Sequence, residues 1–361
     1  MSGGRRWRVP TGVALAVSLV AAGLLLAYPP GSDEPAPASR TSLAQAWPGA
    51  ARAEIPGNLP DGPVYQPLIF LDARTSAGTA PSPDGTGLRL VLRGADGTPR
   101  ELRRRPLESH PEFATMAVSG TDLVWTESAG DGPTEVWAAT TSGTEVRRLT
   151  RDTGNAVFFG SQWDVVIADG RAWWAAAADD PEVTEIRSVP LAGGAVTVRR
   201  EPGTWALTTW PWLTDGSGDQ TGTTRLRSLA SPEEVRVASS GTELATCGPA
   251  WCRVLVLTSE GLARIDAMRP DGTGRRRIAD GTAGAAVPDV AVLDRFEILS
   301  EADPNSALTG TEGLLVHDLR DGRTVDVSAA AEAAYARNGV LWWSTGDQDS
   351  LVWHTLDLRT V

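Results

Sequence analysis

The stretch ATMAVSGTDLVWTESAGDGPTEVWAATTSGTEVRRLT, residues 114–150, contains four short runs rich in β-branched and aromatic residues. Gly, Ser, Asp and Pro, the residues that turns favour, separate the runs. Residues 164–201, DVVIADGRAWWAAAADDPEVTEIRSVPLAGGAVTVRRE, repeat this order, with tryptophan in the second run and paired arginines in the fourth. A four-stranded repeat of about 40 residues predicts one blade of a β-propeller.

Weaker copies of the unit follow along the chain, at residues 206–239, 244–280, 290–328 and 333–358, and a partial copy precedes residue 114. We therefore predict an all-β propeller of seven four-stranded blades over residues 59–361, with six or eight blades as alternatives. The first blade lacks a clear inner strand, and the last ends after three strands. Because an open blade leaves an exposed edge, we expect residues 51–57 to supply the missing outer strand and close the ring.

Three turns resemble those of a known family. MRPDGTGRRRIAD (268–280) and TTSGTEVRRLTRD (140–152) resemble the hairpin between the third and fourth strands of TolB-like, WD40-like propeller repeats. SPDGTGLRL (82–90) resembles the Ser-Pro-Asp-Gly turn of the same family. The resemblance implies a propeller fold and a role in protein interaction or as an envelope scaffold, which is an analogy at the level of the fold.

The N-terminal segment carries a targeting signal. Residues 1–8 include three arginines, and the apolar run 12–28 is about 26 Å long as a helix, near the thickness of a bilayer core. We predict a basic cytoplasmic tail (1–8), a single transmembrane anchor (9–28) and a Pro/Ala-rich linker (29–58). The propeller is then held at the cell membrane, outside the cytoplasm. A signal peptide cleaved near Ala36–Ala38 is the alternative.

Tryptophan is unusually frequent, with 14 in the chain. Seven lie at or near the second strands of successive units: Trp125, Trp173, Trp174, Trp212, Trp251, Trp342 and Trp343. Repetition in nearly every blade favours packing between blades over a ligand platform. Neighbours on a strand face opposite sides, so the two indoles of each doublet should contact different blades.

Charge is distributed unevenly. The net charge of −12, without a basic stripe, argues against nucleic acid as a partner. Arginine pairs gather on the outer strands, whereas the six loops between second and third strands hold 13 acidic and no basic residues. The simplest interpretation is turn chemistry and solubility. The alternative is a docking face for a cationic partner or Ca²⁺, with these candidate residues: Asp131, Asp179, Asp180, Glu182, Asp215, Asp219, Asp303, Asp347 and Asp349.

The only two cysteines are Cys247 and Cys252. Four residues separate them, which does not fit the Cys-x-x-C motif of redox proteins. Export to an oxidising compartment and a position at the turn between two strands favour a structural disulfide.

No catalytic constellation stands out, and the three histidines lack metal-binding spacing. We therefore expect a non-catalytic interaction, scaffold or sensing module without a cofactor, whose partner is another protein or a component of the cell envelope. The alternative is a glycan hydrolase or lyase that uses loop carboxylates of the acidic face. Two carboxylates in one pocket, one with a raised pKa, would distinguish it.

Overall fold

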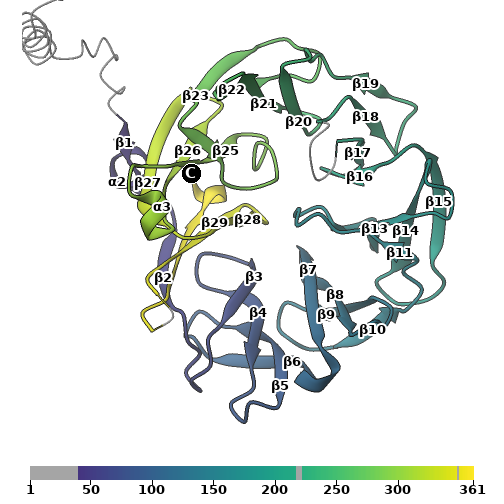
Figure 1. The fold of residues 1–361 in the computed structure, drawn as a ribbon. Helices are drawn as coiled ribbons and strands as arrows, with labels where there is room; N and C mark the ends of the chain where they lie inside the picture. Colours follow the sequence, from purple (N-terminus) through teal and green to yellow (C-terminus); the bar gives the residue numbers. More distant parts are fainter. Residues whose placement is uncertain (1–39, 217–221, 348) are drawn as a thin grey trace, which may run out of the picture. The chain divides into compact units, whose positions relative to one another are not determined.

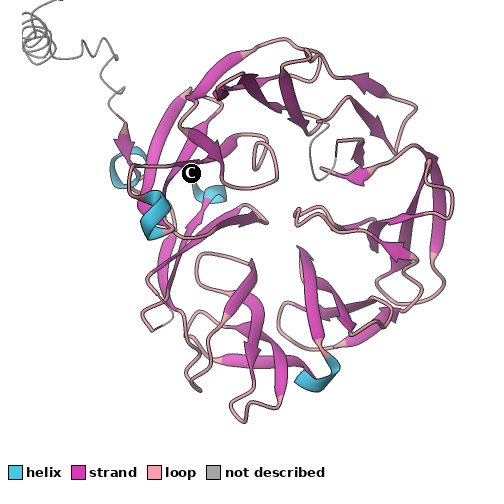
Figure 2. Ribbon diagram, viewed as in Figure 1, coloured by secondary structure: helices cyan, strands magenta, loops and turns pink. Residues whose placement is uncertain are grey.

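The computed structural model describes residues 40–216, 222–347 and 349–361. The unit Thr41–Val361 is a ring of seven β-sheets (Figure 1), with only short helical turns between the strands (Figure 2). The predicted tail (1–8), the anchor (9–28) and residues 29–39 of the predicted linker lie outside the described residues. Within the described ranges no helix is long and apolar enough to cross a membrane.

Blades one to four follow one another along the chain, each an antiparallel sheet with its first strand innermost. Blade one comprises β3 (Gln66–Phe70), β4 (Ser76–Pro81), β5 (Gly87–Arg93) and β6 (Pro99–Pro106). Blade two comprises β7 (Pro111–Ser119), β8 (Asp122–Ala129), β9 (Glu135–Thr140) and β10 (Arg147–Thr150). Blade three comprises β11 (Asn155–Ala156), β12 (Val165–Ala168), β13 (Arg171–Ala177), β14 (Val183–Pro190) and β15 (Thr197–Pro202). Blade four comprises β16 (Ala206–Leu207), β17 (Trp212–Thr214), β18 (Arg225–Ser228) and β19 (Glu234–Arg236).

Blades five to seven complete the ring. Blade five comprises β20 (Glu243–Cys247), β21 (Cys252–Thr258), β22 (Gly261–Met268) and β23 (Arg276–Asp280). Blade six comprises β24 (Ala283–Ala285), β25 (Phe296–Glu301), β26 (Glu312–Asp318), β27 (Arg323–Ala331) and the added β1 (Thr41–Ser42). Blade seven comprises β28 (Ala334–Arg337), β29 (Val340–Thr345), β30 (Val352–Asp357) and β2 (Arg52–Pro56). The helical elements are α2 (Leu43–Ala46), η1 (Leu107–Ser109), α3 (Ser306–Thr309) and η2 (Leu358–Thr360).

The ring closes through the N-terminal part of the propeller. Strand β2 pairs antiparallel with β30 and is the outer strand of blade seven, as expected for residues 51–57. Ile55 lies opposite Trp353 in this pairing and is buried against Phe70 of blade one and Trp342. The first and last segments of the unit therefore share one sheet.

Two details differ from the sequence predictions. Blade one has a complete inner strand, β3, which the sequence pattern did not reveal because Pro67 and a register shift after it interrupt the alternation. The folded unit also begins at Thr41, earlier than the expected boundary at residue 59. The side chains of Leu43 and Trp47 account for the second difference, since both are buried against blade six.

The tryptophans pack between blades, as their repetition predicts. Trp125, Trp174 and Trp342 are among the largest fully buried side chains. Trp174 packs in the cluster between blades two and three, whereas Trp173 joins the cluster between blades three and four. Each indole of the doublet therefore contacts a different neighbouring blade, as the alternation of strand residues requires.

The two hairpins compared with TolB-like repeats connect third and fourth strands. Residues 141–146 join β9 to β10, and residues 269–275 join β22 to β23. Gly143 and Gly272 have φ angles of 77° and 85°, which explains why glycine occupies both positions.

Candidate functional site

The predicted acidic loops all lie between the second and third strands of their blades. Because the blades are antiparallel sheets arranged in the same sense around one axis, these loops share one face of the ring, here called the acidic face. Seven of the nine predicted residues are exposed there, namely Asp131, Asp179, Asp180, Glu182, Asp303, Asp347 and Asp349. Asp215 is half-buried, and Asp219 lies outside the described residues.

Several of these acids organise their own loops. Asp180 accepts a hydrogen bond from the Glu182 amide at 3.0 Å, and Asp303 accepts one from the Asn305 amide at 2.6 Å. Asp347 accepts hydrogen bonds from the Ser350 hydroxyl and nearby amides, which lower its pKa. The acids are spread over five blades, and in the described ranges no three metal-ligating side chains come together. Turn chemistry therefore explains much of the acidity.

One groove on the acidic face differs from the rest. It has a volume of about 740 Å³ and lies between blades six and seven, below α3 and beside the connection from β27 to β28. Its floor is apolar and made of small side chains, including Ala285, Ala302 and Ala334. Tyr335 forms part of the wall and stacks on Trp342 with ring centroids 5.5 Å apart.

Acidic side chains surround the groove. Asp303, Glu312 and Glu332 line it, and no lysine or arginine does so among the described residues. Glu312 and Glu332 are exposed and pair with no basic side chain of the described chain. The sequence pattern did not predict Glu332, because the acidic pattern recurs in loops between second and third strands and Glu332 lies between β27 and β28. Connections from a fourth strand to the next first strand reach the same face.

The outer-strand arginines are largely neutralised. Arg103 donates to the buried Glu127 at 2.7 Å, and Arg148 lies 3.6 Å from Glu135. Arg275 bridges Glu243 and Asp266 at 2.7 and 2.9 Å. The rim of the ring is therefore less positive than the sequence alone predicts, and its arginines tie strands and blades together.

Two loops project toward the centre of the ring (Figure 1). Residues 157–164 separate β11 from β12 in blade three, and residues 286–295 join β24 to β25 in blade six. Asp289 links them: it accepts hydrogen bonds from the Ser161 hydroxyl at 2.5 Å and the Gln162 amide at 3.0 Å. The loops of blades three and six therefore meet inside the ring.

Arg337 of blade seven joins the same cluster. It donates to the Gly160 carbonyl at 3.1 Å and faces the carboxylates of Asp164 and Asp289. Burial raises the pKa of Asp164 to about 6, although amides of Phe159 and Gly160 donate to it. Burial also raises the pKa of Asp289. Sequence analysis missed this cluster because its members come from three blades and no local motif joins them.

Among the described residues, Asp164 and Asp289 most resemble the carboxyl pair that a glycan hydrolase would require. They line one pocket of about 100 Å³. This volume is well below the several hundred Å³ usual for ligand sites. Their oxygens also accept hydrogen bonds that hold the two channel loops. Their geometry therefore suits loop anchoring better than glycan cleavage.

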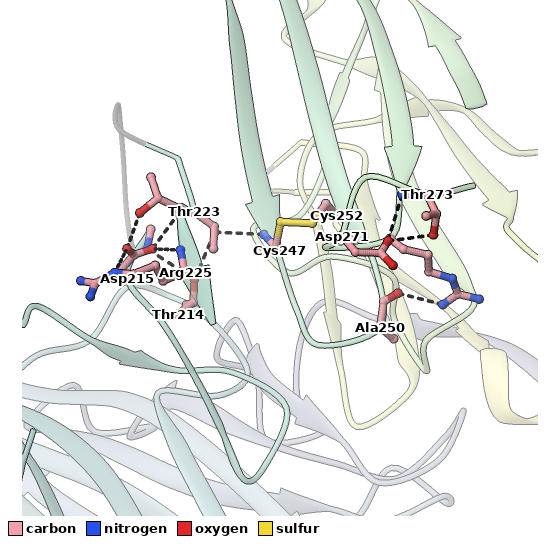
Figure 3. Close-up of a disulfide and its surroundings, with 12 residues drawn as sticks. Thr214, Asp215, Thr223, Arg225, Cys247, Ala250, Cys252, Asp271 and Thr273 are labelled. Carbon is pink, nitrogen blue, oxygen red and sulfur yellow. Dashed lines mark hydrogen bonds and ion pairs between the residues drawn. A yellow bond between two sulfur atoms is a disulfide. The ribbon is translucent and has the colours of Figure 1, made fainter. Parts of the chain in front are cut away.

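Cys247 and Cys252 form a disulfide between β20 and β21 (Figure 3), as predicted. The Cys247 amide donates to the Thr223 hydroxyl at 3.0 Å, so the hairpin of blade five is also fixed to blade four. Asp215 lies nearby but is engaged by the amides of Thr224 and Arg225 (Figure 3). The disulfide stabilises a hairpin and lies apart from the groove.

Comparisons with known proteins support the fold. No family model matches the chain, and no curated protein matches it. A puromycin-hydrolysing peptidase of Mycobacterium tuberculosis matches 89% of this chain and 55% of its own, with 12% identity and a TM-score of 0.51. The chain therefore spans about half the length of that peptidase.

Two further structures match with lower scores. The β-propeller domain of the trilobed protease of Pyrococcus furiosus matches 67% of this chain and 83% of its own, with 12% identity and a TM-score of 0.43. TolB of Acinetobacter baumannii matches 79% of this chain and 51% of its own, with 12% identity and a TM-score of 0.29. At 12% identity the likeness to the Mycobacterium tuberculosis peptidase extends to the fold alone.

Proposed function

We propose that the chain is a protein-binding module of the cell envelope that docks a partner in the groove between blades six and seven. The observation that carries this proposal is an apolar groove of about 740 Å³ rimmed by Asp303, Glu312 and Glu332. A partner segment that presents a lysine or arginine among small apolar side chains complements both its floor and its charge.

Exposed apolar surface supports a contact at this place. Leu308 of α3 is 87% exposed and is the most exposed large apolar side chain of the described residues. Tyr335 is 38% exposed and is held in place by Trp342. Rigid aromatic and aliphatic side chains around a hollow are typical of interface centres.

The cellular location is part of the proposal. The apolar run 12–28 after three arginines suits an uncleaved anchor with the propeller outside the cytoplasm. The disulfide supports an oxidising compartment, where such bonds persist. The docking proposal requires no cofactor.

The glycan hydrolase or lyase is less well supported. A general acid needs a raised pKa, whereas hydrogen bonds lower the pKa of Asp347 on the acidic face. For Asp215, burial raises the pKa, but hydrogen bonds from Thr224 and Arg225 outweigh burial and lower it. These carboxylates are suited to remain ionised, which fits attraction of a cationic partner.

Site-specific photo-crosslinking in intact cells tests the docking proposal. A photoreactive residue at position 308 should form a defined adduct with one partner, whereas the same residue in place of Val198, on the outer strand of blade three, should not. Glu312→Lys with Glu332→Lys should abolish the adduct. The matched control is Glu260→Lys, an exposed loop residue of blade five on the same face. An adduct that survives the double substitution would contradict the proposal.

A further inference from the structure

A second hollow opens on the face opposite the acidic face, at the mouth of the central channel. Its volume is about 390 Å³, and residues of every blade except blade five line it. Met116, Val166, Val292 and Leu293 contribute apolar surface. Small-molecule sites usually have about 300–1,000 Å³, a mostly apolar lining and a few polar groups. The size and lining of this channel mouth fall in that range.

The backbone around the channel mouth is strained. Seven non-glycine residues of the described chain have positive φ, and four of them line this hollow: Ala291, Leu293, Asp294 and Asn338, with φ between 50° and 58°. Asn338 belongs to the Asn-Gly turn between β28 and β29, where positive φ is ordinary, so Ala291 and Leu293 carry the strain. Leu293 is also 48% exposed, although a large apolar side chain is favoured inside. Strain of this kind persists only where the surroundings impose it, and it gathers at functional sites.

The surroundings do impose this conformation. The buried Arg253 of β21 donates to the carbonyls of Val287 and Pro288 at 3.2 and 2.8 Å. Glu297, its ion-pair partner at 2.6 Å, accepts from the Ala291 amide at 2.9 Å. The loop 286–295 is therefore held rigidly before any ligand arrives, which favours binding.

The charged side chains that line the channel mouth are Asp294, Arg337 and Arg359, and Arg359 is paired with Asp357 at 2.7 Å. The Nη atoms of Arg337 donate to Thr115 and Gly160, and its Nε has no acceptor among the described residues. Asp164 and Asp289 already face its guanidinium, and Arg253 with Glu297 form a pair beside them. Within the hollow itself, an anion would meet Asp294 and a cation would meet the Arg337 guanidinium. The surroundings therefore favour an uncharged ligand with an oxygen acceptor.

We propose that the channel mouth binds a small, uncharged, mainly apolar molecule whose carbonyl oxygen accepts a hydrogen bond from Arg337. The apolar part lies against Met116, Val166 and Leu293. This site is independent of the docking groove, since the two lie on opposite faces and share no lining residue.

Four probes of similar shape test this proposal on the full-length chain: acetophenone, ethylbenzene, benzoate and benzylammonium. Methyl resonances of Met116, Val166 and Leu293 should shift with acetophenone. Ethylbenzene should bind about fivefold more weakly, the value of one hydrogen bond. Both charged probes should bind more weakly than acetophenone.

Three variants make the test specific. Thr209 lines the hollow from the loop after β16, so Thr209→Phe should fill it and abolish binding, with unchanged thermal unfolding as the check on folding. Arg337→Lys keeps the charge and should reduce the advantage of acetophenone over ethylbenzene. Leu308→Ala, on the acidic face, should change nothing.

Three results would overturn the proposal. The first is no shift of these methyl groups up to the solubility limit of acetophenone. The second is equal affinity for acetophenone and ethylbenzene, or tighter binding of benzoate. The third is unchanged binding to folded Thr209→Phe.

Discussion

At the scale of single residues, the pair Arg253 and Glu297 organises the centre of the ring. Both side chains are buried, and their 2.6 Å ion pair joins blade five to blade six. Their remaining hydrogen bonds go to the backbone of the loop 286–295. Burying an ion pair costs desolvation free energy. If only one partner is removed, the other remains as a buried charge without a counterion. The position of the channel loop therefore depends on both residues together.

Glu297→Gln tests this dependence. The substitution leaves the Arg253 guanidinium buried without a counterion, so the free energy of unfolding should fall by about 3–5 kcal/mol. Denaturant unfolding measures the change. Glu260→Gln, at an exposed position, should change stability by less than about 0.5 kcal/mol. A loss below about 1 kcal/mol for Glu297→Gln would show that the pair is dispensable.

Asp164 predicts a pH dependence of stability. Its pKa is about 6 in the fold against an ordinary value of 3.8. The folded state therefore binds the proton more tightly than the unfolded state does. As the pH rises from 4 to 7, loss of this proton should lower the free energy of unfolding by up to about 3 kcal/mol. Asp164→Asn cannot titrate, so the stability difference between variant and wild type should change through this window and level off above it.

Unfolding curves of both proteins at intervals between pH 4 and pH 8 measure the effect. Carboxylates whose pKa is lowered, such as Glu185 with its Arg187 partner, act in the opposite direction at lower pH and are present in both proteins. Parallel pH profiles for the two proteins would contradict the assignment.

At the scale of elements, strand β2 turns an open row of blades into a ring. It supplies the outer strand of blade seven and buries Ile55 against Phe70 of blade one. Without it, β30 would present an unpaired edge, which sheet proteins avoid. The stability of the whole unit should therefore depend on a strand that precedes its first blade.

Ile55→Ala tests the contribution of β2. The substitution removes a side chain that is only 3% exposed, so the free energy of unfolding should fall by about 2–5 kcal/mol. Val198→Ala, at an exposed position on the outer strand β15, is the matched control and should cost less than about 0.5 kcal/mol. Equal effects of the two substitutions would mean that β2 does not secure the ring.

The sequence was most informative about elements that repeat. Seven blades, the closing strand and the loop positions follow from a regular alternation of strands and turns. The alternation is regular because each blade packs against its neighbours in the same way. The channel loops could not be predicted. Residues 157–164 and 286–295 have no period, and Asp164, Asp289 and Arg337 meet only because the ring closes. Glu332 was not predicted for a related reason. It lies in the connection from β27 to β28, and only the fold places this connection beside α3.

At the scale of the whole molecule, the ring presents two faces with different chemistry. The acidic face carries a groove lined by small apolar side chains and by the carboxylates of Asp303, Glu312 and Glu332. The opposite face carries the channel mouth, whose walls come from six blades and whose charged side chains include Arg337. The buried pair of Arg253 and Glu297 and the two loops that meet at Asp289 separate these faces. A rigid ring of this kind suits simultaneous contacts on both sides.

Carboxyl labelling tests the docking proposal most directly. Intact envelopes and the purified full-length chain are treated with a carbodiimide and a neutral amine, and mass spectrometry gives the labelling rate at each acidic residue. If a partner occupies the groove, Glu312 and Glu332 should react several-fold more slowly in envelopes, whereas Glu260 should react at the same rate in both. Unchanged rates at Glu312 and Glu332, or an equal slowing at Glu260, would contradict the docking proposal.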